Sequence, residues 1–318
     1  MNAPRVSILI PCRNAERWLA TAVESALAQR AVACEVIVVN DGSTDRSGDI
    51  ARRYTPAAVR VLDQPARGAA AARNRALAAS SGAWVQFLDA DDALDSDKIA
   101  RQLDVLARAP ADTVASASWG RFAADQSPAS AVFADAAVER DFAPAWEFLA
   151  HHASTGDMMH PAAWLCPREL LLRAGPWDET LTLNDDGEYF ARVLRLATAV
   201  RFVPGARTFY RSALPGSLSR ARGRAAMVSL HRAVERMAGE LLATGDSPRI
   251  RQALCDFWER TRFELYPEAP DLSDDAAARA RRWGRPRVTF VCGPRLRWVA
   301  RLGGWKLARR LQRHRQAP

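Results

Sequence analysis

Three carboxylates stand close together at the end of an apolar run. The run AWVQFL (83–88) is followed at once by Asp89, Asp91 and Asp92. Carboxylates this close repel one another unless a cation lies between them, and hard divalent cations bind both carboxylate and phosphate oxygens. Acidic residues also occur in the first turn of a helix, where they accept hydrogen bonds from free N–H groups. We expect that simpler role for Asp92, ahead of a helix at 96–109.

Four short apolar runs precede residue 110 and alternate with amphipathic segments. These runs are VSILI (6–10), EVIVV (35–39), VRVL (59–62) and WVQFL (84–88). Runs that are apolar on both faces are typical of strands in a buried parallel sheet. Between them we expect a helix capped by Asn14, a second from near Ser43 and Thr44, and a third that stops at Gly82. Alternating strands and helices predict a doubly wound α/β sheet.

The residues that follow these runs are rich in carboxylates. They are residues 11–14, 40–45, 63–67 and 89–92. Ligands of such sheets bind beyond the carboxyl ends of the strands, which here share one edge. Neither GxxxxGK[ST] nor GxGxxG follows the first run, so a bound nucleotide would need metal and arginine to neutralise its phosphates. Arg67, Arg73 and Arg75 lie in the right region, although a solvated helix face is the simpler role for Arg75.

A second acidic pair, Asp185 and Asp186, opens a predicted helix. The residues that form one apolar stripe with Asp186 are Phe190, Val193, Leu194 and Ala197. Asp186 therefore begins the inward face of this helix, and the helix dipole favours its ionised form. An ionised carboxylate that faces a cleft can deprotonate a hydroxyl group. The alternative is an acidic pair at a helix start that has no chemical role.

Beyond residue 110 the pattern is less regular. We expect a strand at 113–119, and helices at 144–152, 168–174 and 186–197, with a mostly helical region from 218 to 266. Two segments contain side chains that could bind a ligand or a metal. His151, His152 and His160 have no recognised metal-ligand spacing and are better suited to loop or acceptor-wall positions. FYRSALPGSLSR (209–220) could bind oxyanions or form a polar connecting loop.

The basic charge of the chain is concentrated near its end. Residues 279–315 contain 13 Lys and Arg and no Asp or Glu, so the formal net charge of +9 leaves −4 on the remaining residues. Basic segments that carry tryptophan favour anionic membrane surfaces. We expect residues 281–318 to contact a membrane, as helical pieces interrupted by Gly293, Pro294 and the Gly303–Gly304 pair. A partner-binding helix is the alternative, and nucleic acid is disfavoured because no recognised binding motif accompanies the charge.

Other features bear on the class of protein. No apolar run approaches the roughly 18 residues of a membrane span, and the VSILIP run lacks the features of a secretory signal. We therefore expect a cytoplasmic protein, peripheral on the inner face of the membrane if the basic tail binds lipid. Five scattered cysteines without CxxC spacing predict reduced, mostly packed thiols.

Several of these motifs together resemble a known family. VSILIPCRNAERWLATAVESALAQ, EVIVVNDGSTDRS and RGAAAARNRALAASSGAWVQFLDADD match, in order and spacing, the N-terminal half of family 2 glycosyltransferases with the GT-A fold. LLLRAGPWDETLTLNDDGEYFARVLR resembles the acceptor-side motif of that family. The resemblance extends from residue 4 to about residue 213. It implies a GT-A domain, a doubly wound and mostly parallel sheet, with a C-terminal helical extension.

The resemblance also implies a division of the chain. The expected parts are a GT-A domain at 1–215, with a nucleotide-sugar half (1–112) and an acceptor half (113–215), a helical extension at 216–280 and the basic tail at 281–318.

The resemblance assigns roles to single residues. Pro11 and Asn14 would line the nucleotide pocket, Asp41 would hydrogen-bond the base, and Arg67 and Arg73 would lie near the nucleotide.

Three further carboxylates receive chemical roles by the same resemblance. Asp89 would contact the ribose or the water of the metal, Asp91 would ligate Mn²⁺ or Mg²⁺ beside the diphosphate, and Asp186 would be the catalytic base. One departure is that the usual DDGSTD of the family reads NDGSTD here. Asn40 brings no charge, so base recognition should depend on Asp41.

The implied activity is inverting transfer from a nucleoside-diphosphate sugar. We expect a UDP-sugar donor and a glycan, polyprenyl-linked or other hydroxyl acceptor, in the assembly of envelope or extracellular polysaccharide or glycolipid. One alternative is an inactive nucleotide-binding scaffold of the same fold, which only Asn40 favours. A nicotinamide-dependent oxidoreductase is a further alternative, which the missing glycine motif disfavours.

Overall fold

The computed structural model of the protein describes residues 5–55, 59–212 and 221–314. The chain divides into two compact units. The first consists of Met1–Phe148, Asp157–Thr180 and Tyr189–Ser217, and the second of Leu149–Gly156, Leu181–Glu188 and Leu218–Pro318. The domain boundaries expected from the sequence remain predictions.

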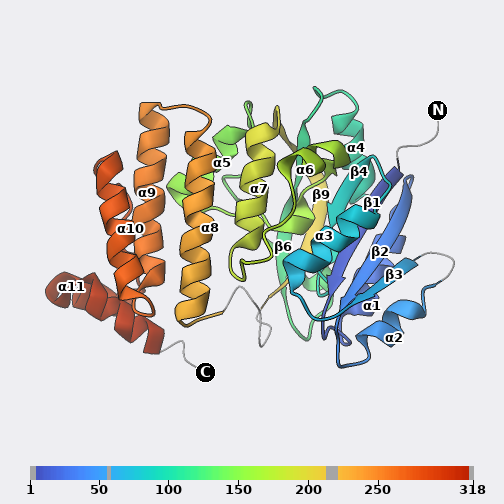
Figure 1. Cartoon of the computed structure of the whole chain (residues 1–318), viewed down its shortest axis with the longest axis horizontal. Helices are drawn as coiled ribbons and strands as arrows, with labels where there is room; N and C mark the ends of the chain where they lie inside the picture. Colours follow the sequence, from blue (N-terminus) through green and yellow to red (C-terminus); the bar gives the residue numbers. More distant parts are fainter. Residues whose placement is uncertain (1–4, 56–58, 213–220, 315–318) are drawn as a thin grey trace. The chain divides into compact units, whose positions relative to one another are not determined.

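Five strands form the first sheet of the first unit. They are β1 (Arg5–Cys12), β2 (Ala33–Asp41), β3 (Val59–Gln64), β4 (Trp84–Phe87) and β8 (Cys166–Pro167). Their order is β3-β2-β1-β4-β8, and only the short β8 runs antiparallel to its neighbour. Figure 1 shows β1 to β4 side by side. The predicted parallel sheet is confirmed, and the carboxyl ends of β1 to β4 share one edge.

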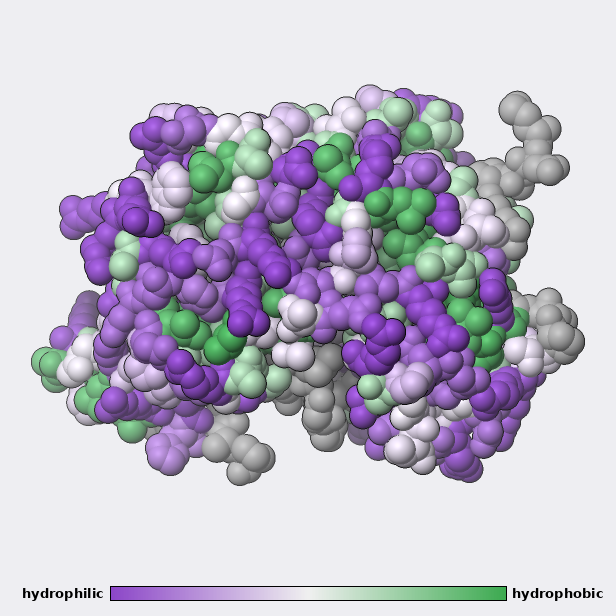
Figure 2. All heavy atoms as spheres, viewed as in Figure 1, coloured by the Kyte–Doolittle hydropathy of each residue, from purple (hydrophilic) through white to green (hydrophobic). Residues whose placement is uncertain are grey.

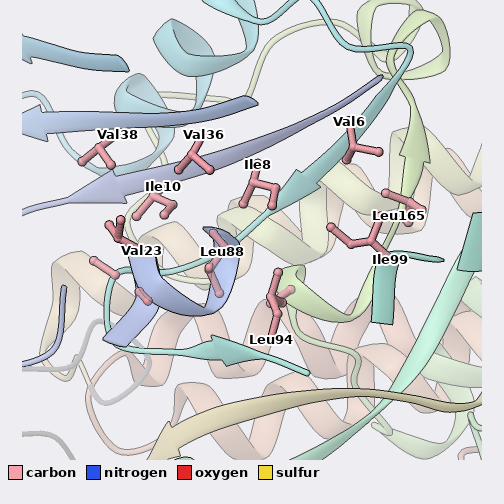
Figure 3. Packing of buried hydrophobic residues seen from close by; sticks show 14 of the residues in the cluster. Val6, Ile8, Ile10, Val23, Val36, Val38, Leu88, Leu94, Ile99 and Leu165 are labelled. Carbon is pink, nitrogen blue, oxygen red and sulfur yellow. The ribbon is translucent and has the colours of Figure 1, made fainter. Parts of the chain in front are cut away.

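Helices cover both faces of this sheet. On one face Val6, Ile8 and Ile10 of β1 are fully buried and pack with Val23 of α1 (Leu19–Leu27), as Figure 3 shows. On the other face the alanine-rich α3 (Ala69–Ala79) packs against β1 and β2. Because neither face of the central strands meets water, their apolar runs are continuous rather than alternating, whereas the edge strand β3 has exposed residues.

Two helices start later than the sequence suggests. α1 begins at Leu19, and α2 occupies Ser47–Arg52. Asn14 therefore does not cap α1, and that prediction is wrong. Asn14 adopts a left-handed backbone (φ +50), and its Oδ1 accepts a hydrogen bond of 2.8 Å from the Thr44 N–H. Its side chain thus stabilises the loop after β2 instead of a helix of its own.

A second sheet lies next in the same unit. Its strands are β5 (Ala93–Leu94), β6 (Val114–Ala123), β7 (Val132–Phe133) and β9 (Val200–Ser212). Their order is β5-β9-β6-β7, with β6 and β9 parallel. The strand predicted at 113–119 is confirmed and extends further. β5 pairs Ala93 with Phe209 of β9, which brings the end of β9 to the acidic loop before β5.

Four further helices belong wholly or partly to the first unit. They are α4 (Lys98–Leu106), α5 (Trp146–Thr155), α6 (Arg168–Ala174) and α7 (Asp185–Leu196), with 3-10 turns at Pro128–Ser130 and Pro161–Ala163. α6 coincides with its predicted range. In α7 the predicted stripe is confirmed, because Phe190, Val193 and Leu194 are buried. The first four residues of α7 and residues 149–155 of α5 fall in the second unit.

The second unit is mainly helical. Its helices are α8 (Arg224–Leu242), α9 (Pro248–Leu265), α10 (Pro270–Trp283) and α11 (Pro294–His314). α9 packs against both α8 and α10. α11 is kinked at Gly304 (φ +78), as the glycine pair predicts. In the part of the chain that the structure describes, no helix has both the length and the apolar composition that spanning a bilayer requires.

The cysteines are free thiols. Cys12, Cys166 and Cys255 are buried, and burial raises the pKa of Cys12 and Cys255 to about 11. Packed, unreactive thiols are what their scattered spacing predicts.

A lysine is fully buried beneath the first sheet. Lys98 of α4 donates hydrogen bonds to Oε1 of Gln86 and, at 2.8 Å, to Oε1 of Gln102. Both glutamines in turn donate to backbone carbonyl groups, so the amides cannot turn away. Burial lowers the pKa of Lys98 to about 7. The network joins β4 to α4 with a cation that is costly to keep charged.

Lys98→Met is expected to lower the free energy of unfolding by about 2–4 kcal/mol at about pH 9, because both buried glutamine oxygens lose their donor. Between the folded pKa of about 7 and the ordinary value of 10.5, the unfolded chain binds more protons, so Lys98 makes stability rise with pH. The deficit of the variant should therefore shrink at about pH 6. Urea unfolding of the wild type and the variant at both pH values measures this deficit in the free energy of unfolding. The exposed-site control Lys306→Met should show no such pH dependence, and an equal deficit at both pH values would contradict the assignment.

Candidate functional site

The acidic loop follows β4 at the shared edge of the sheet. Asp89 accepts a hydrogen bond of 2.8 Å from Nη2 of Arg73. The Arg73 side chain is only 7% exposed and lies over the Trp177 ring, 4.6 Å from its centre. A buried, stacked arginine is a rigid partner. Asp89 is therefore held in place by Arg73 of α3.

Asp91 is a strongly perturbed acid of this loop. Burial, together with the nearby carboxylates of Asp92 and Asp89, raises its pKa to about 8. A carboxyl group in such surroundings takes up a proton unless a cation compensates its charge. Among the described residues no three His, Cys, Asp or Glu side chains form a metal cage. The donor set fits a hard divalent cation of the magnesium type, which one or two carboxylates hold together with substrate phosphates.

Asp92 does not have the helix-start role expected for it. It is 1% exposed, its Oδ1 accepts a hydrogen bond of 2.8 Å from the backbone N–H of Arg211, and its Oδ2 lies 3.6 Å from Nδ1 of His160. The prediction fails because β5 follows the loop directly and α4 begins only at Lys98. Asp92 instead ties the acidic loop to β9.

Arg211 was missed as a site residue and lies under the acidic loop. Its Nε donates to the backbone oxygen of Asp91 at 2.9 Å, and its Nη1 donates to the carbonyl oxygens of Ala124 and Gln126 at 3.0 and 3.1 Å. Its guanidinium also lies 4.4 Å from the centre of the Phe122 ring. The only sequence signal was its place in the segment 209–220, of which 213–220 lie outside the described residues. Arg211 is a positioning residue for Asp91.

Arg211→Lys is expected to lower the free energy of unfolding by about 2–3 kcal/mol, because one ammonium cannot reach all three backbone carbonyl groups. We also expect a higher KM for the donor, since the Asp91 backbone loses its support. Urea unfolding and initial-rate kinetics measure the two effects. Arg207→Lys, an exposed change on the same strand, is the control. Equal stability and kinetics in the two variants would contradict the positioning role.

Asp41 organises the loop after β3. Its Oδ1 accepts hydrogen bonds from Nε2 of Gln64 at 2.7 Å and from the Arg67 N–H at 2.8 Å, and its Oδ2 accepts from the Gly68 N–H at 2.8 Å. A carboxylate has about four acceptor sites, so one remains for a ligand. Binding of a base by Asp41 stays a prediction. β2 and β4 lie on either side of β1, so their ends are about 10 Å apart.

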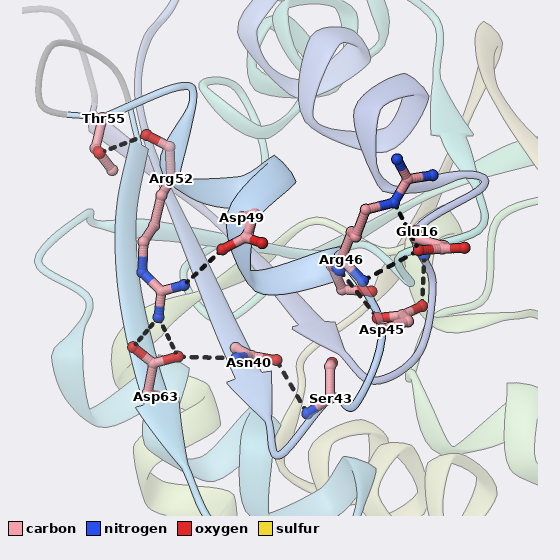
Figure 4. Close-up of polar contacts among 10 residues, drawn as sticks. Glu16, Asn40, Ser43, Asp45, Arg46, Asp49, Arg52, Thr55 and Asp63 are labelled. Atoms are coloured by element: carbon pink, nitrogen blue, oxygen red, sulfur yellow. Dashed lines mark hydrogen bonds and ion pairs between the residues drawn. The ribbon is translucent and has the colours of Figure 1, made fainter.

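Asn40 has a structural reason to be uncharged. Its Nδ2 donates to Oδ1 of Asp63 at 2.8 Å, and its Oδ1 accepts from the Ser43 N–H at 3.2 Å (Figure 4). Arg52 binds both oxygens of Asp63, at 2.9 and 2.8 Å. Hydrogen bonding from Asn40 and the charge of Arg52 lower the pKa of Asp63. A second carboxylate at position 40 would lie against that of Asp63.

Asn40→Asp is expected to lower the free energy of unfolding by about 1 kcal/mol at neutral pH, a value reduced by solvent because Asp63 is half exposed. The loss should shrink toward about pH 3, where one of the two carboxylates takes up a proton. Thermal unfolding at the two pH values measures it. Asn40→Ala removes the hydrogen bond to Asp63 without adding charge, so its loss should depend less steeply on pH. A pH-independent loss in Asn40→Asp would contradict the repulsion.

The GPWDET segment is fastened to α3. The Asn74 side chain accepts from the Trp177 N–H at 2.7 Å and donates to the Trp177 carbonyl at 2.9 Å. Glu179 forms an ion pair of 2.7 Å with Nη2 of Arg67 and accepts from Asn74 at 3.1 Å. Arg67 thus lies at the sheet edge as expected, with its guanidinium held by Glu179. Its contact with a nucleotide stays a prediction.

Aromatic packing fixes part of α7 in the first unit. Tyr189 stacks on Trp177 with ring centres 4.1 Å apart, and both Tyr189 and Phe190 contact Phe87 edge-on, at 6.0 and 6.5 Å. Phe87 lies two residues before Asp89. Asp186, in the first turn of the same helix, is partly buried, and its Oδ1 accepts from the Gly187 N–H at 2.9 Å.

The remaining predicted positions are split between the units. Pro11 is buried at the end of β1, and the exposed Asn14 donates from its backbone N–H to Oγ of Ser43 at 3.1 Å. His160 is buried in the first unit and packs against Trp119 and Tyr210, whereas 151–152 belong to the second unit. Asp186 also belongs to the second unit, so its position opposite the acidic loop stays a prediction.

Comparison with known proteins identifies the N-terminal part. Residues 7–142 match the family model described as glycosyl transferase family 2. The chain carries a family 2 glycosyltransferase domain. The uncharacterized glycosyltransferase EpsJ of Bacillus subtilis (strain 168) is 29% identical over 225 residues, which are 68% of this chain and 63% of EpsJ. The chain therefore spans less than two thirds of this curated relative.

Solved structures share the fold of this chain. Residues 1–349 of TarS from S. aureus, in complex with UDP-GlcNAc, align with a TM-score of 0.65 and 16% identity, covering 91% of this chain and 95% of that one. The mannosyltransferase PcManGT from Pyrobaculum calidifontis, in complex with GDP-Man and Mn²⁺, aligns with a TM-score of 0.58 and 20% identity, covering 98% and 84%. The expected GT-A fold with C-terminal helices is thereby confirmed.

Proposed function

We propose that this protein is an inverting glycosyltransferase that moves a sugar from a nucleoside-diphosphate sugar to a hydroxyl acceptor. The observation that carries the proposal is the acidic loop at the sheet edge. There Asp89 is fixed by Arg73, and Asp91 has a raised pKa that a bound cation would reverse. A family 2 glycosyltransferase domain includes this loop.

The donor is proposed to be a UDP-sugar. Two proteins of the same fold support a nucleotide-sugar donor, because TarS was solved with UDP-GlcNAc and PcManGT with GDP-Man and Mn²⁺. In this chain Asn14 and Asp41 lie at the end of the sheet where such a base and ribose would bind. Arg67 and Arg73 follow on the next loop and helix, close to the place for the phosphates.

Asp91 and Asp89 would hold the divalent cation, Mn²⁺ or Mg²⁺. When bound, the cation supplies positive charge where negative charge develops on the leaving diphosphate. The residues of the chain keep the two carboxylates in position. Arg73 binds the Asp89 side chain, and Arg211 binds the backbone oxygen of Asp91.

Asp186 is proposed to be the catalytic base. Its carboxylate accepts the proton of the acceptor hydroxyl, whose oxygen then forms a bond to the anomeric carbon as the bond to the diphosphate oxygen breaks on the opposite face. A single displacement inverts the configuration. Support comes from α7, where Tyr189 and Phe190, one turn after Asp186, pack against Phe87 at the end of β4.

The acceptor class is proposed from the same family. We expect a hydroxyl of a glycan or of a polyprenyl-linked glycan, in the assembly of envelope or extracellular polysaccharide or glycolipid. The cytoplasm is the proposed site of the reaction, where nucleotide sugars are the available donors.

A donor panel tests the proposal. The protein is incubated with UDP- and GDP-sugars, with Mn²⁺, Mg²⁺ or a chelator, and with a set of glycan acceptors, while released nucleoside diphosphate is measured. We expect release that needs both metal and acceptor. Tight nucleotide binding without release under any condition would favour an inactive scaffold, and absence of both would contradict the proposal.

A further inference from the structure

One face of α11 presents two neighbouring rows of side chains to solvent. Trp298 and Leu302 are one helical turn apart and are 63% and 84% exposed. Arg297 and Arg301, also one turn apart, form the adjacent row and are exposed as well. Residues at i and i+4 lie on the same side of a helix. An apolar row therefore lies beside a cationic row.

The opposite face of α11 is packed, so this arrangement is held in place. Leu296, Val299 and Ala308 are buried in a cluster that Phe290 borders. Beyond the kink, Trp305 packs edge-on against Phe263, with ring centres 4.9 Å apart.

Ion pairs add to this anchorage. The guanidinium of Arg309 donates to Oε2 of Glu264 at 3.0 Å and to the Tyr266 carbonyl at 3.3 Å. The inner face and the second half of α11 thus belong to the core of this unit. Trp298 and Leu302 are therefore exposed on a helix that is packed into the folded unit.

The surroundings of the two rows are apolar and cationic. Arg297, Trp298 and Arg301 line an open hollow together with Phe290 and Val291, which is itself 82% exposed. Figure 2 shows hydrophobic and hydrophilic surface side by side over α11. Within the described part of the chain, no hydrogen bond or ion pair joins Arg297 or Arg301 to an acidic side chain.

We propose that this face of α11 docks on the surface of an anionic lipid bilayer. Tryptophan and leucine side chains gain free energy when they enter the boundary between headgroups and acyl chains, and arginine binds lipid phosphates. Val291 adds a further exposed apolar side chain to the hollow, and positions 279–315 contain no acidic residue. The proposal does not depend on transferase activity, so the two fail or succeed separately.

Other occupants fit the charges less well. In a two-fold contact between two copies, the row of Arg297 and Arg301 in one copy would face the same positively charged row in the other. Nucleic acid would satisfy the arginines but would leave Trp298 and Leu302 without a hydrophobic partner.

Vesicle flotation of the full chain tests the proposal. We expect flotation with vesicles of mixed phosphatidylcholine and phosphatidylglycerol, and none with pure phosphatidylcholine. Binding should weaken as salt is raised. Arg297→Glu/Arg301→Glu should lower the partition coefficient by about 30-fold or more, since each basic residue at an anionic surface contributes about five-fold. Trp298→Ser/Leu302→Ser should lower the partition coefficient at low salt and at high salt alike.

Matched controls separate this face from net charge and from general hydrophobicity. Arg53→Glu/Arg108→Glu makes the same charge change on exposed positions of the first unit, and Val132→Ser removes an apolar side chain that is 72% exposed. Both should float like the wild type. Equal flotation of all variants, failure of the wild type to bind anionic vesicles, or a concentration-dependent dimer that the α11 variants abolish would overturn the proposal.

Discussion

Asp186→Asn is expected to lower the rate of sugar transfer by about 10²–10⁴-fold, while the affinity for the donor stays within a few-fold. The amide keeps the shape of the carboxylate and its hydrogen bond with the Gly187 N–H, but it cannot accept the acceptor proton. The loss should therefore appear in kcat. Single-turnover kinetics and calorimetric titration of the nucleotide measure the two quantities separately.

Asp185→Asn is the matched control for this prediction. It makes the same change one residue earlier in the first turn of α7. We expect it to retain transfer within a few-fold, because Asp186, and not Asp185, is one helical turn before Phe190 in the stripe that also contains the buried Val193 and Leu194. Equal losses of transfer in both variants would mean that the two acids only stabilise the first turn of α7. Transfer close to that of the wild type in Asp186→Asn would contradict the role of Asp186 as base.

Asp91→Asn is expected to weaken metal-dependent donor binding by about 10²-fold or more, because the cation loses an anionic ligand. Cation binding to the wild type needs the ionised carboxylate, whose pKa is raised to about 8. Affinity should therefore rise with pH up to about 8, with proton release that the variant lacks. Calorimetric titration of nucleotide with Mn²⁺, in buffers of different ionisation enthalpy, measures both.

The same variant should not be less stable in the absence of metal. The folded pKa of Asp91 is raised from 3.8 to about 8, so its contribution to stability is present below about pH 4 and is lost as pH rises through about 8. Asp91→Asn removes this effect and should unfold at or above the wild-type temperature at about pH 8. The exposed control Asp104→Asn should change neither property. A destabilised variant, or unchanged metal-dependent binding, would contradict the assignment of Asp91.

The sheet and its functional edge could be predicted because local patterns determine them. Strands such as VSILI and EVIVV are apolar on both faces, which is typical of a sheet covered by helices on both sides. Given parallel strands, the residues after each run must share an edge, and Asp41, Asp89 and Asp91 lie there.

Contacts between distant segments could not be predicted in the same way. Arg211 reaches the Asp91 backbone across 120 residues of sequence, through the pairing of β5 with β9. Asn14 and Asp92 were given local helix-capping roles, but each binds a distant loop or strand, because its side chain had a better partner in the tertiary structure. Short polar side chains suit both roles, and their pattern along the chain does not distinguish them.

The most direct test is a crystal structure of the protein with Mn²⁺ and an unreactive analogue of its nucleotide-sugar donor. The measured quantities are the distances from the metal to the Asp91 carboxylate and from the Asp186 carboxylate to the space in front of the anomeric carbon. The account predicts direct coordination by Asp91, with Asp186 facing that carbon from the side opposite the diphosphate. A metal bound elsewhere, or an Asp186 turned away from the sugar, would contradict it.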